Sequence, residues 1–294
     1  MATLVAAAPL SSQALAVRTP DGWRTWWRAD SAPVAWRAAH PVLDSAVTWR
    51  RAARGLDLAE VTLRGDGEAW RIRLLLARVD PTAVTMRVVV PPVRANGFAG
   101  RWSIDDAPRD AILALNAGQF TAGPWGWLLQ EGTVRQGAGT GALAPGVVIA
   151  TDGRVTIVPR DSLPAVRDAR EGFQSYPTLL EGDGEIPLPL RRAGLGVNLT
   201  HRDSRLAFGV LRDGRVLIAL TRFEGLGGVL EAAPFGFTTP EMAAILGGLG
   251  AQRAVLLDGG LSGQMLAREG RSVRRWRGMR GVAAGLVVTP RTVR

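Results

Sequence analysis

The sequence predicts a mixed α/β (α+β) fold, a strand-rich single domain with a mixed sheet and a few helices. Three observations predict it: short apolar segments punctuated by Gly, Pro and Asp turn signals, one segment with helical periodicity, and a composition typical of a globular domain. Of the 294 residues, 47% are apolar and 21% charged, and 36 glycines and 18 prolines are spread along the chain. Such a chain can bury a core and is rich in turns.

The predicted strands begin in the first third of the chain. Residues 60–64 and 70–79 are rich in β-formers and are joined by Gly65-Asp66-Gly67, a hairpin signal. Asp80-Pro81 then leads to a third run, 84–90. Five further runs of the same kind are 113–115, 146–151, 155–158, 205–211 and 216–221. Strands therefore dominate the predicted architecture.

One helix is predicted to begin at Thr238. Thr238 and Glu241 make a capping box, in which each side chain accepts a hydrogen bond from the backbone of the other residue. Glycines 247, 248 and 250 end the element. Its apolar face consists of Met242, Ile245, Leu246 and Leu249.

The helix is followed by residues 254–257, which are wholly apolar and fit a central strand covered on both faces. The carboxyl end of this strand releases the polar loop 258–263. Open α/β sheets bind ligands at such strand ends, so we expect a ligand site there.

We divide the chain into an N-terminal extension, residues 1–44, and one domain, residues 45–294. Residues 18–54 hold five tryptophans among arginines and alanines, and we interpret them as an arm packed onto the main body. The tryptophans either cover apolar surface or form a sugar-stacking or membrane-surface arm.

The apolar run 3–16 ends in Ala14-Leu15-Ala16, which has the shape of a signal-peptide cleavage region, but it lacks the basic residues with which a signal peptide begins. It is either a disordered start or the end of an export signal that begins upstream.

The formal net charge of +10 comes from arginine alone, because the sequence contains no lysine. The arginines are scattered and not clustered into a stripe, which argues against a nucleic-acid site. The net charge still predicts attraction to some polyanion, whether nucleic acid, anionic lipid or phosphorylated glycan. Cysteine is absent, which excludes disulfides and thiolate chemistry. His40 and His201 are isolated, without the spacing of a triad or a two-histidine metal motif. We therefore expect no metal and no cofactor, with a divalent cation as the open alternative.

Three polar residues next to apolar runs are candidates for chemistry. Asn116 follows residues 112–115 and offers an amide donor and acceptor together, or else forms an Asn-Ala-Gly turn. Asp258 opens a loop whose glycines leave backbone amides free for a polar ligand, or else caps a tight turn. Arg205 carries a guanidinium that suits phosphate oxygens, or else is one more surface arginine.

The order of these segments resembles that of the phosphodiester glycosidase family, from around Ser45 to the C-terminus, with Asp80-Pro81 as an early match. The family includes a lysosomal enzyme that uncovers mannose 6-phosphate and many bacterial envelope and exopolysaccharide-associated proteins. Five blocks in the same order are more specific than any single one. They are Asn116-Ala117-Gly118-Gln119-Phe120; Gln174-Ser175-Tyr176-Pro177-Thr178-Leu179 with Asp183-Gly184; Arg205 to Gly209 with Asp213-Gly214-Arg215; Gly236-Phe237-Thr238 with Glu241-Met242-Ala243; and Leu257-Asp258-Gly259-Gly260-Leu261-Ser262.

The sequence departs from the family pattern at two places. The family's last loop usually reads Asp-Gly-Gly-Gly-Ser-Ser, whereas Leu261 and Gly263 stand at its third glycine and second serine. Many members carry Asp-Gly-Arg after the second strand of the Arg205 hairpin, where this chain has residues 221–225. If that aspartate is catalytic in the family, Glu224 or Glu231 must replace it here, or activity is lost.

The resemblance implies hydrolysis of the bond between a sugar's anomeric carbon and a phosphodiester oxygen. In this mechanism Arg205, with the backbone N–H groups of Gly259 and Gly260, binds the departing phosphate. Asp258 is the base or nucleophile, Asn116 orients the sugar or water, and Thr238 positions the phosphate. Further substrate contacts are expected from Gly118, Phe120, Asp183, Gly259, Gly260 and Ser262. Trp125 and Trp127 either stack on a sugar or pack in the core.

We therefore expect a hydrolase that acts on a phosphodiester-linked glycan or envelope polymer and is located outside the cytoplasm, with a cytoplasmic location as the alternative. A non-catalytic glycan-binding protein of the same fold is the first rival, favoured by the altered loop. A nucleic-acid binder is the second, favoured only by charge. No apolar run reaches the ~18 residues that a membrane-spanning helix needs. The oligomeric state is not predicted.

Overall fold

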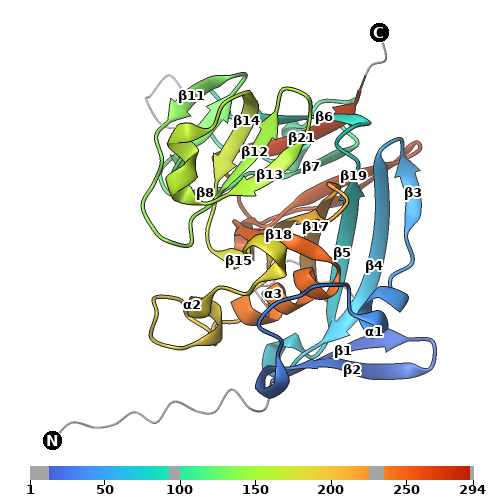
Figure 1. Cartoon of the computed structure of the whole chain (residues 1–294). Coiled ribbons are helices and arrows are strands. Elements are labelled where there is room, and N and C mark those ends of the chain that lie inside the picture. The colour runs from blue at the N-terminus through green and yellow to red at the C-terminus, as the bar shows by residue number, and fades with distance from the viewer. Residues whose placement is uncertain (1–12, 93–99, 225–234, 292–294) are drawn as a thin grey trace, which may run out of the picture.

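Three β-sheets form most of the computed structural model, which describes residues 13–92, 100–224 and 235–291 (Figure 1). The largest sheet has nine strands, in the order β15-β18-β16-β17-β5-β4-β1-β2, with β3 paired to β4. Its strands are β1 (Ala14–Thr19), β2 (Gly22–Arg28), β3 (Arg50–Ala53), β4 (Leu56–Arg64), β5 (Ile72–Val79), β15 (Thr178–Leu180), β16 (Leu206–Leu211), β17 (Val216–Phe223) and β18 (Ala251–Leu257).

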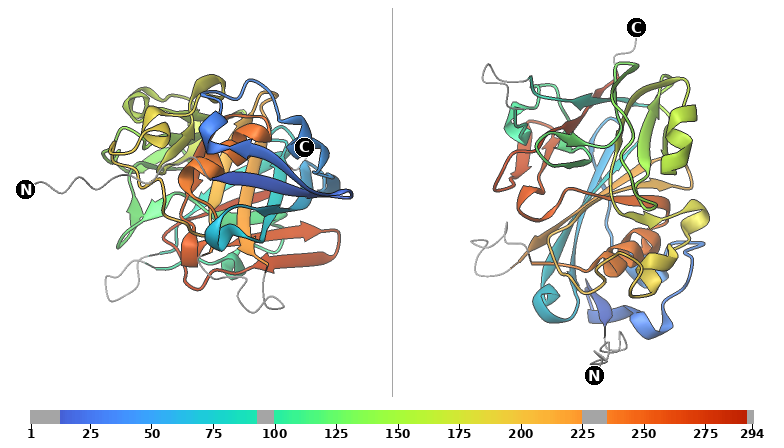
Figure 2. Two further views of the ribbon diagram at one scale, coloured as in Figure 1. Left: turned by 90° about the horizontal axis from the view of Figure 1, so that it is seen from below. Right: turned by 90° about the vertical axis from the view of Figure 1, so that its left-hand side faces the viewer.

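Two five-stranded sheets lie at the end of the molecule opposite the β1–β2 hairpin (Figure 2). Their orders are β11-β10-β14-β12-β13 and β20-β19-β7-β21-β6, and β8 pairs with β9 alone. The strands are β6 (Val84–Val89), β7 (Leu113–Asn116), β8 (Gln119–Phe120), β9 (Pro124–Trp125), β10 (Leu128–Gln130), β11 (Thr133–Gln136), β12 (Gly146–Ala150), β13 (Val155–Val158), β14 (Ala169–Gln174), β19 (Met265–Glu269), β20 (Ser272–Trp276) and β21 (Gly285–Pro290).

The strand-rich fold with few helices is confirmed. The α-helices of the described residues are α1 (Pro41–Ser45), α2 (Leu188–Arg191) and α3 (Thr239–Gly248). The sheets differ from the expected mixed type in one respect, because the strand pairs formed by the described residues are all antiparallel. None of the helices that the structure describes is long and apolar enough to span a bilayer.

The strand β18 is buried on both faces, as its sequence predicts. Ala254 and Leu256 belong to the core cluster that includes α3, whereas Val255 and Leu257 belong to the cluster shared with the five-stranded sheets. Alternate side chains of a strand point to opposite faces, so an apolar residue at every position fits a strand that is covered twice. The packing against two layers fixes the direction in which β18 releases the loop that starts at Asp258.

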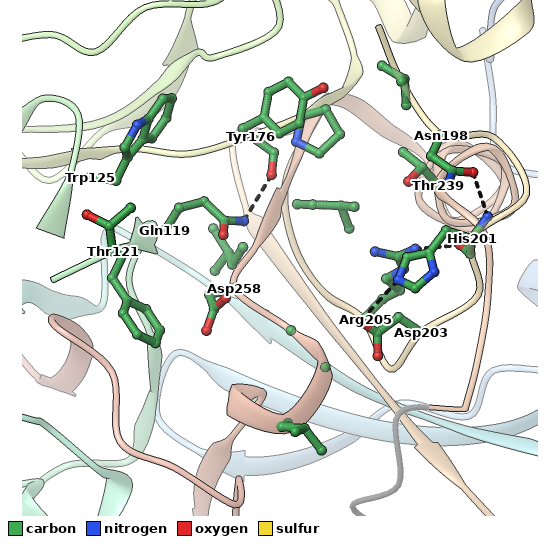
Figure 3. Close-up of a pocket in the computed structure, with 18 of the residues that line it drawn as sticks. Gln119, Thr121, Trp125, Tyr176, Asn198, His201, Asp203, Arg205, Thr239 and Asp258 are labelled. Carbon is green, nitrogen blue, oxygen red and sulfur yellow. Dashed lines mark hydrogen bonds and ion pairs between the residues drawn. The ribbon is translucent and has the colours of Figure 1, made fainter. Parts of the chain in front are cut away.

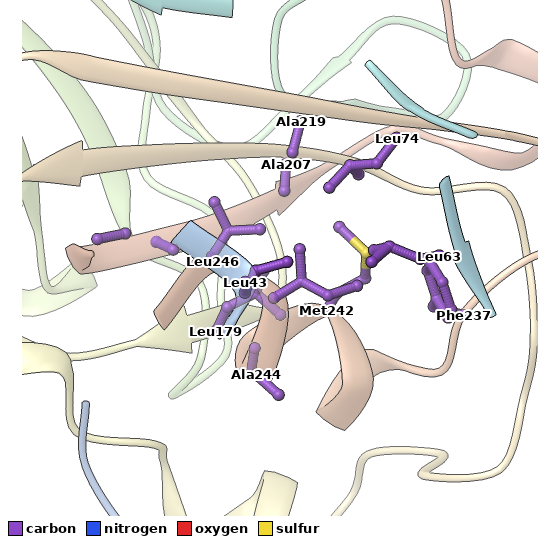
Figure 4. Packing of buried hydrophobic residues seen from close by; sticks show 14 of the residues in the cluster. Leu43, Leu63, Leu74, Leu179, Ala207, Ala219, Phe237, Met242, Ala244 and Leu246 are labelled. Atoms are coloured by element: carbon purple, nitrogen blue, oxygen red, sulfur yellow. The ribbon is translucent and has the colours of Figure 1, made fainter. Parts of the chain in front are cut away.

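The predicted capping box of α3 is also confirmed. The Thr238 hydroxyl accepts a hydrogen bond from Glu241 N (3.3 Å), and the Glu241 carboxylate accepts one from Thr238 N (2.8 Å). Arg202 donates two hydrogen bonds to the same carboxylate, which therefore remains paired although it is fully buried. The helix packs Met242 and Leu246 against the nine-stranded sheet (Figure 4).

The tryptophan-rich segment covers α3 and extends the nine-stranded sheet. Trp26, Trp27 and Trp36 are each more than nine-tenths buried, so at these positions the tryptophans cover apolar surface. A Cβ at Gly247 would collide with the Trp36 ring, and one at Gly248 would lie 2.8 Å from Trp26, so these glycines make room for the two rings.

Most of the run 3–16 lies outside the described residues, and its last residues open β1. The division at residue 44 stays a prediction.

Candidate functional site

A cleft of about 740 Å³ lies where the end of β18, the start of β16 and the β8–β9 hairpin meet (Figure 3). One wall is polar and carries Asn198, His201, Asp203, Arg205 and Thr239. The other wall is largely aromatic and carries Phe120, Trp125 and Tyr176. Asp258 lies between the two walls in the view of Figure 3. Such a cleft can hold a ligand with one charged end and one end suited to stacking.

Asp258 combines burial with a free carboxylate oxygen. Its Oδ2 atom is buried and has no hydrogen-bond partner among the described residues. Burial raises the pKa of this carboxyl above its usual 3.8, and the nearby Ser262 hydroxyl and Arg280 charge oppose the shift. The proximity of Asp203 pushes the pKa of Asp258 in the same direction as burial. A carboxyl group of this kind in a cleft is a candidate acid, base or nucleophile.

The loop after Asp258 is held from behind by Asn116. The Nδ2 atom of Asn116 donates to the carbonyl oxygens of Asp258 (2.8 Å) and Ser262 (2.9 Å), and Asn116 is fully buried. Asp258 N donates to Gly118 O (3.1 Å). Gly118 has φ +71°, and a Cβ there would lie 2.6 Å from Gln174 O. These contacts fix the backbone on both sides of Asp258.

The two glycines of the loop let it lie against the entry to β16. A Cβ at Gly259 would lie 2.6 Å from Ser204 O, and one at Gly260, where φ is +52°, would lie 2.8 Å from an Asp203 oxygen. Gly260 N donates to Ser204 O (2.7 Å), so this amide is not free for a phosphate. The Gly259 N–H has no hydrogen-bond partner among the residues described and remains open to a ligand.

Arg205 lines the cleft and is anchored by backbone carbonyls. Its Nε donates to Phe237 O (2.9 Å) and its Nη2 to His201 O (2.8 Å). Within the described part of the chain, Nη1 has no such partner. Burial lowers the pKa of Arg205, opposed by the charges of Asp203 and Glu241, but a guanidinium stays charged at any physiological pH. Arg205 can therefore direct one N–H edge at an anion.

Asp203 is a cleft residue that sequence reasoning missed. Burial raises the pKa of its carboxyl, which the charge of Arg205 opposes. Its Oδ1 is buried without a partner among the described residues, and its Oδ2 lies 3.8 Å from His201 Nε2. Asp203 stands two positions before Arg205, but the sequence alone does not show that the fold brings its carboxylate to Gly260 at the lining of the cleft.

The structure brings only some of the predicted site residues into the cleft. Those that line it are Phe120, Arg205, Asp258, Gly259 and Gly260. Asn116, Gly118, Thr238 and Ser262 lie behind it, where Thr238 caps α3 and the Ser262 hydroxyl accepts from Arg280 Nε (2.8 Å).

The remaining residues lie elsewhere. Asp183 is exposed and pairs with Arg37 and Arg212, and Glu224 pairs with Arg71, all outside the cleft. Glu231 lies outside the described residues. Trp125 lines the cleft, whereas Trp127 is buried in a small core cluster.

No group of three or more His, Asp or Glu side chains that could hold a metal occurs in the part of the chain that the structure describes.

Sequence and structure comparisons identify proteins that are similar to this chain. The sequence profile of the phosphodiester glycosidase family matches residues 109–289. The structure is similar to the zebrafish N-acetylglucosamine-1-phosphodiester alpha-N-acetylglucosaminidase catalytic domain, auto-inhibited by its pro-peptide, with a TM-score of 0.60 and 16% identity over 89% of this chain and 96% of that chain. It also resembles a hypothetical protein from Synechocystis, with a TM-score of 0.51 and 16% identity over 94% of this chain and 68% of that chain. No curated protein matches the sequence.

Proposed function

Because the chain belongs to the phosphodiester glycosidase family, we propose that its cleft hydrolyses the bond between a sugar's anomeric carbon and a phosphodiester oxygen in a phosphorylated glycan. One observation carries this proposal. Asp258, a carboxyl group with a raised pKa and an unpaired buried oxygen, lies in a cleft that also holds Arg205 and an aromatic wall.

The leaving group determines what the cleft must supply. A phosphate monoester has a second pKa of about 6, so it departs more readily than an alcohol. Protonation of the leaving oxygen therefore matters less than in ordinary glycosides, and the main tasks are to bind the phosphate and to attack the sugar.

Arg205 binds the departing phosphate in this proposal. Its Nη1 edge is free of protein partners within the described residues, while its other nitrogens are fixed by backbone carbonyls 2.8–2.9 Å away. A guanidinium held in place in advance loses little freedom when an anion binds. The Gly259 N–H adds a second donor from the loop.

Asp258 attacks the anomeric carbon or activates the water that does so. Asp203 lines the same cleft, and its charge acts with burial to raise the pKa of Asp258. Retention of anomeric configuration would identify Asp258 as the nucleophile, and inversion would identify it as the base, as NMR of the released sugar can show.

The aromatic wall binds the sugar. Trp125 and Tyr176 present ring surface to the cleft, and the Gln119 amide, which donates to Tyr176 O (3.0 Å), lies between them. Ring surfaces pack against the apolar face of a sugar, and amides fix its hydroxyls.

Asp258→Asn tests the proposal with a sugar nitrophenyl phosphodiester as substrate. Loss of the carboxylate should reduce kcat by at least about a hundredfold, the scale of a lost acid–base group. Asp152→Asn, an exposed turn residue paired with Arg154, is the matched control. Undiminished turnover by Asp258→Asn would refute the assignment.

A second candidate function is binding of such a glycan without catalysis. Leu261 and Gly263 alter the family loop, and Glu224, one replacement for the missing family aspartate, pairs with Arg71 outside the cleft. Saturable binding of the same substrate without any release of sugar would favour this alternative.

We also propose that the protein is located outside the cytoplasm, where envelope glycans occur. Support comes from the resemblance to envelope-associated family members. Cell fractionation with antibodies against the protein tests it.

A further inference from the structure

Phe120, on the aromatic wall, is flanked by two guanidinium groups. Arg101 Cζ lies 4.7 Å and Arg280 Cζ 5.4 Å from the centroid of its ring. The two arginines come from distant segments that a backbone bridge joins, since Trp102 N donates to Val282 O (2.7 Å) and Val282 N to Trp102 O (2.9 Å). The fold thus places two cations on one ring at the edge of the cleft.

Neither cation has a carboxylate partner among the described residues. Arg280 donates from Nε to the Ser262 hydroxyl (2.8 Å), which leaves its terminal nitrogens without a protein acceptor in the described part of the chain. Arg277, by contrast, donates two hydrogen bonds to Asp105. Arg18 and Arg64 share the Trp23 ring outside the cleft, so it is the position beside the cleft that distinguishes Arg101 and Arg280. Two guanidinium groups that share one aromatic ring repel each other, and an anion close to both offsets this repulsion.

The charges of Arg101 and Arg280 both act to lower the pKa of Asp258, so the two arginines lie close enough to influence the cleft. Arg205 lies on the opposite, polar wall. A phosphodiester carries one negative charge, which the proposed function already assigns to Arg205 and the loop. Arg101 and Arg280 therefore provide positive charge beyond what a single phosphodiester requires.

We propose that Arg101, Phe120 and Arg280 form a second anion-binding subsite, which takes a negatively charged group other than the phosphate at Arg205. The inference rests on the proposed function and narrows it, because the preferred substrate then carries at least two negative charges. Two sources supply such a group: a neighbouring phosphodiester in a polymer, or a carboxylate on the bound sugar.

The test compares matched substrates on the full chain. One is a sugar methyl phosphodiester with a single charge, the second extends it by one more sugar-phosphodiester unit, and the third carries a uronic acid as the bound sugar. For each enzyme, the ratio of kcat/KM for a doubly charged substrate to that for the singly charged one is measured. Any effect of the arginines on the ionisation of Asp258 is common to all substrates and cancels in this ratio.

Arg101→Gln and Arg280→Gln should each lower the ratio, and the double variant should lower it about tenfold, with a weaker salt dependence. Arg64→Gln is the control. Arg64 lies outside the cleft, and its Cζ is 4.7 Å from the centroid of the Trp23 ring, so this variant loses the same charge and the same kind of contact. A drop for the two-unit substrate identifies the polymer phosphate, and a drop for the uronic acid identifies the sugar carboxylate. An unchanged ratio with both substrates would overturn the subsite.

A binding measurement separates failure of the subsite from failure of the proposed function. Calorimetric titration with the one-unit and two-unit phosphodiesters needs no turnover. Tighter binding of the two-unit compound that is lost in the double variant would support the subsite even if no sugar is released. Equal affinity of both compounds would overturn it even if hydrolysis occurs.

Discussion

Replacing Asn116 tests how the loop that carries Asp258 is held. Asn116→Ala removes a part-buried hydrogen bond to Asp258 O (2.8 Å) and a buried one to Ser262 O (2.9 Å), and leaves both carbonyls without these donors. A buried polar group left unpaired costs about 1–3 kcal/mol. Because the Asp258 carbonyl is only part-buried and water can reach it, its share is smaller, and the two carbonyls together cost roughly 2–4 kcal/mol of unfolding free energy. A domain with the usual stability of about 5–15 kcal/mol survives this loss. Asn116→Asp keeps the side-chain volume but puts an acceptor oxygen where the Nδ2 donor was, so we expect a loss of stability at least as large.

Urea unfolding at pH 7 measures the stability of both variants, and sugar release measures kcat. A supporting role predicts that stability and kcat fall together, because the loop loses its anchor. The role first expected for Asn116, which is to orient sugar or water, predicts lower kcat at unchanged stability. An Asn116→Asp variant as stable as the parent would refute the supporting role, because the two donor bonds would then contribute nothing.

Five more predictions concern the same region of the structure. The folded-state pKa of Asp258 is raised above 3.8, so ionisation of this carboxyl opposes folding. The stability present below pH 3.8 is lost as the pH rises through the raised value. In urea titrations Asp258→Asn should therefore be more stable than the parent at pH 7 but not at pH 3. If the ionised Asp258 is required, kcat/KM should fall on the acid side at a pH above 3.8. Thr238→Ala should cost about 1 kcal/mol through loss of the helix cap, with Thr238→Ser largely restoring it in thermal unfolding; a changed KM at unchanged stability would instead favour the phosphate role. Gly259→Ala should displace the loop and lower kcat, because its Cβ would lie 2.6 Å from Ser204 O. Gly263→Ala is the control, because its Cβ would meet only ordinary contacts at 3.5 Å, and it should retain most of the parent's kcat. Trp125→Ala should raise KM about fivefold, since one ring contact contributes roughly 1 kcal/mol.

The sequence predicts the elements whose signals are local. The hairpin of β16 and β17, the strand β18 and the capped helix α3 were all expected within a few residues of their observed limits. Each depends on neighbouring residues, such as the Thr238–Glu241 box. The strands β1 and β2 were missed, because the tryptophans and arginines of β2 alternate poorly and β1 pairs with β4, which lies far along the chain.

The site was predicted less well, for a physical reason. A residue next to an apolar run can line a cavity or hold the chain behind it, and only the path of the backbone distinguishes the two. Asp258 and Arg205 do line the cleft, whereas Asn116 donates to the loop from behind. Asp203 enters the cleft because the glycine loop packs against it, a contact between residues far apart in sequence that no local pattern reveals.

The most direct test is hydrolysis of a sugar phosphodiester in water enriched in ¹⁸O. Attack at the anomeric carbon, assisted by Asp258, places the heavy oxygen on the released sugar and none on the phosphate, and Asp258→Asn should abolish this label. Heavy oxygen found in the phosphate would show cleavage of the P–O bond and contradict the glycosidase mechanism.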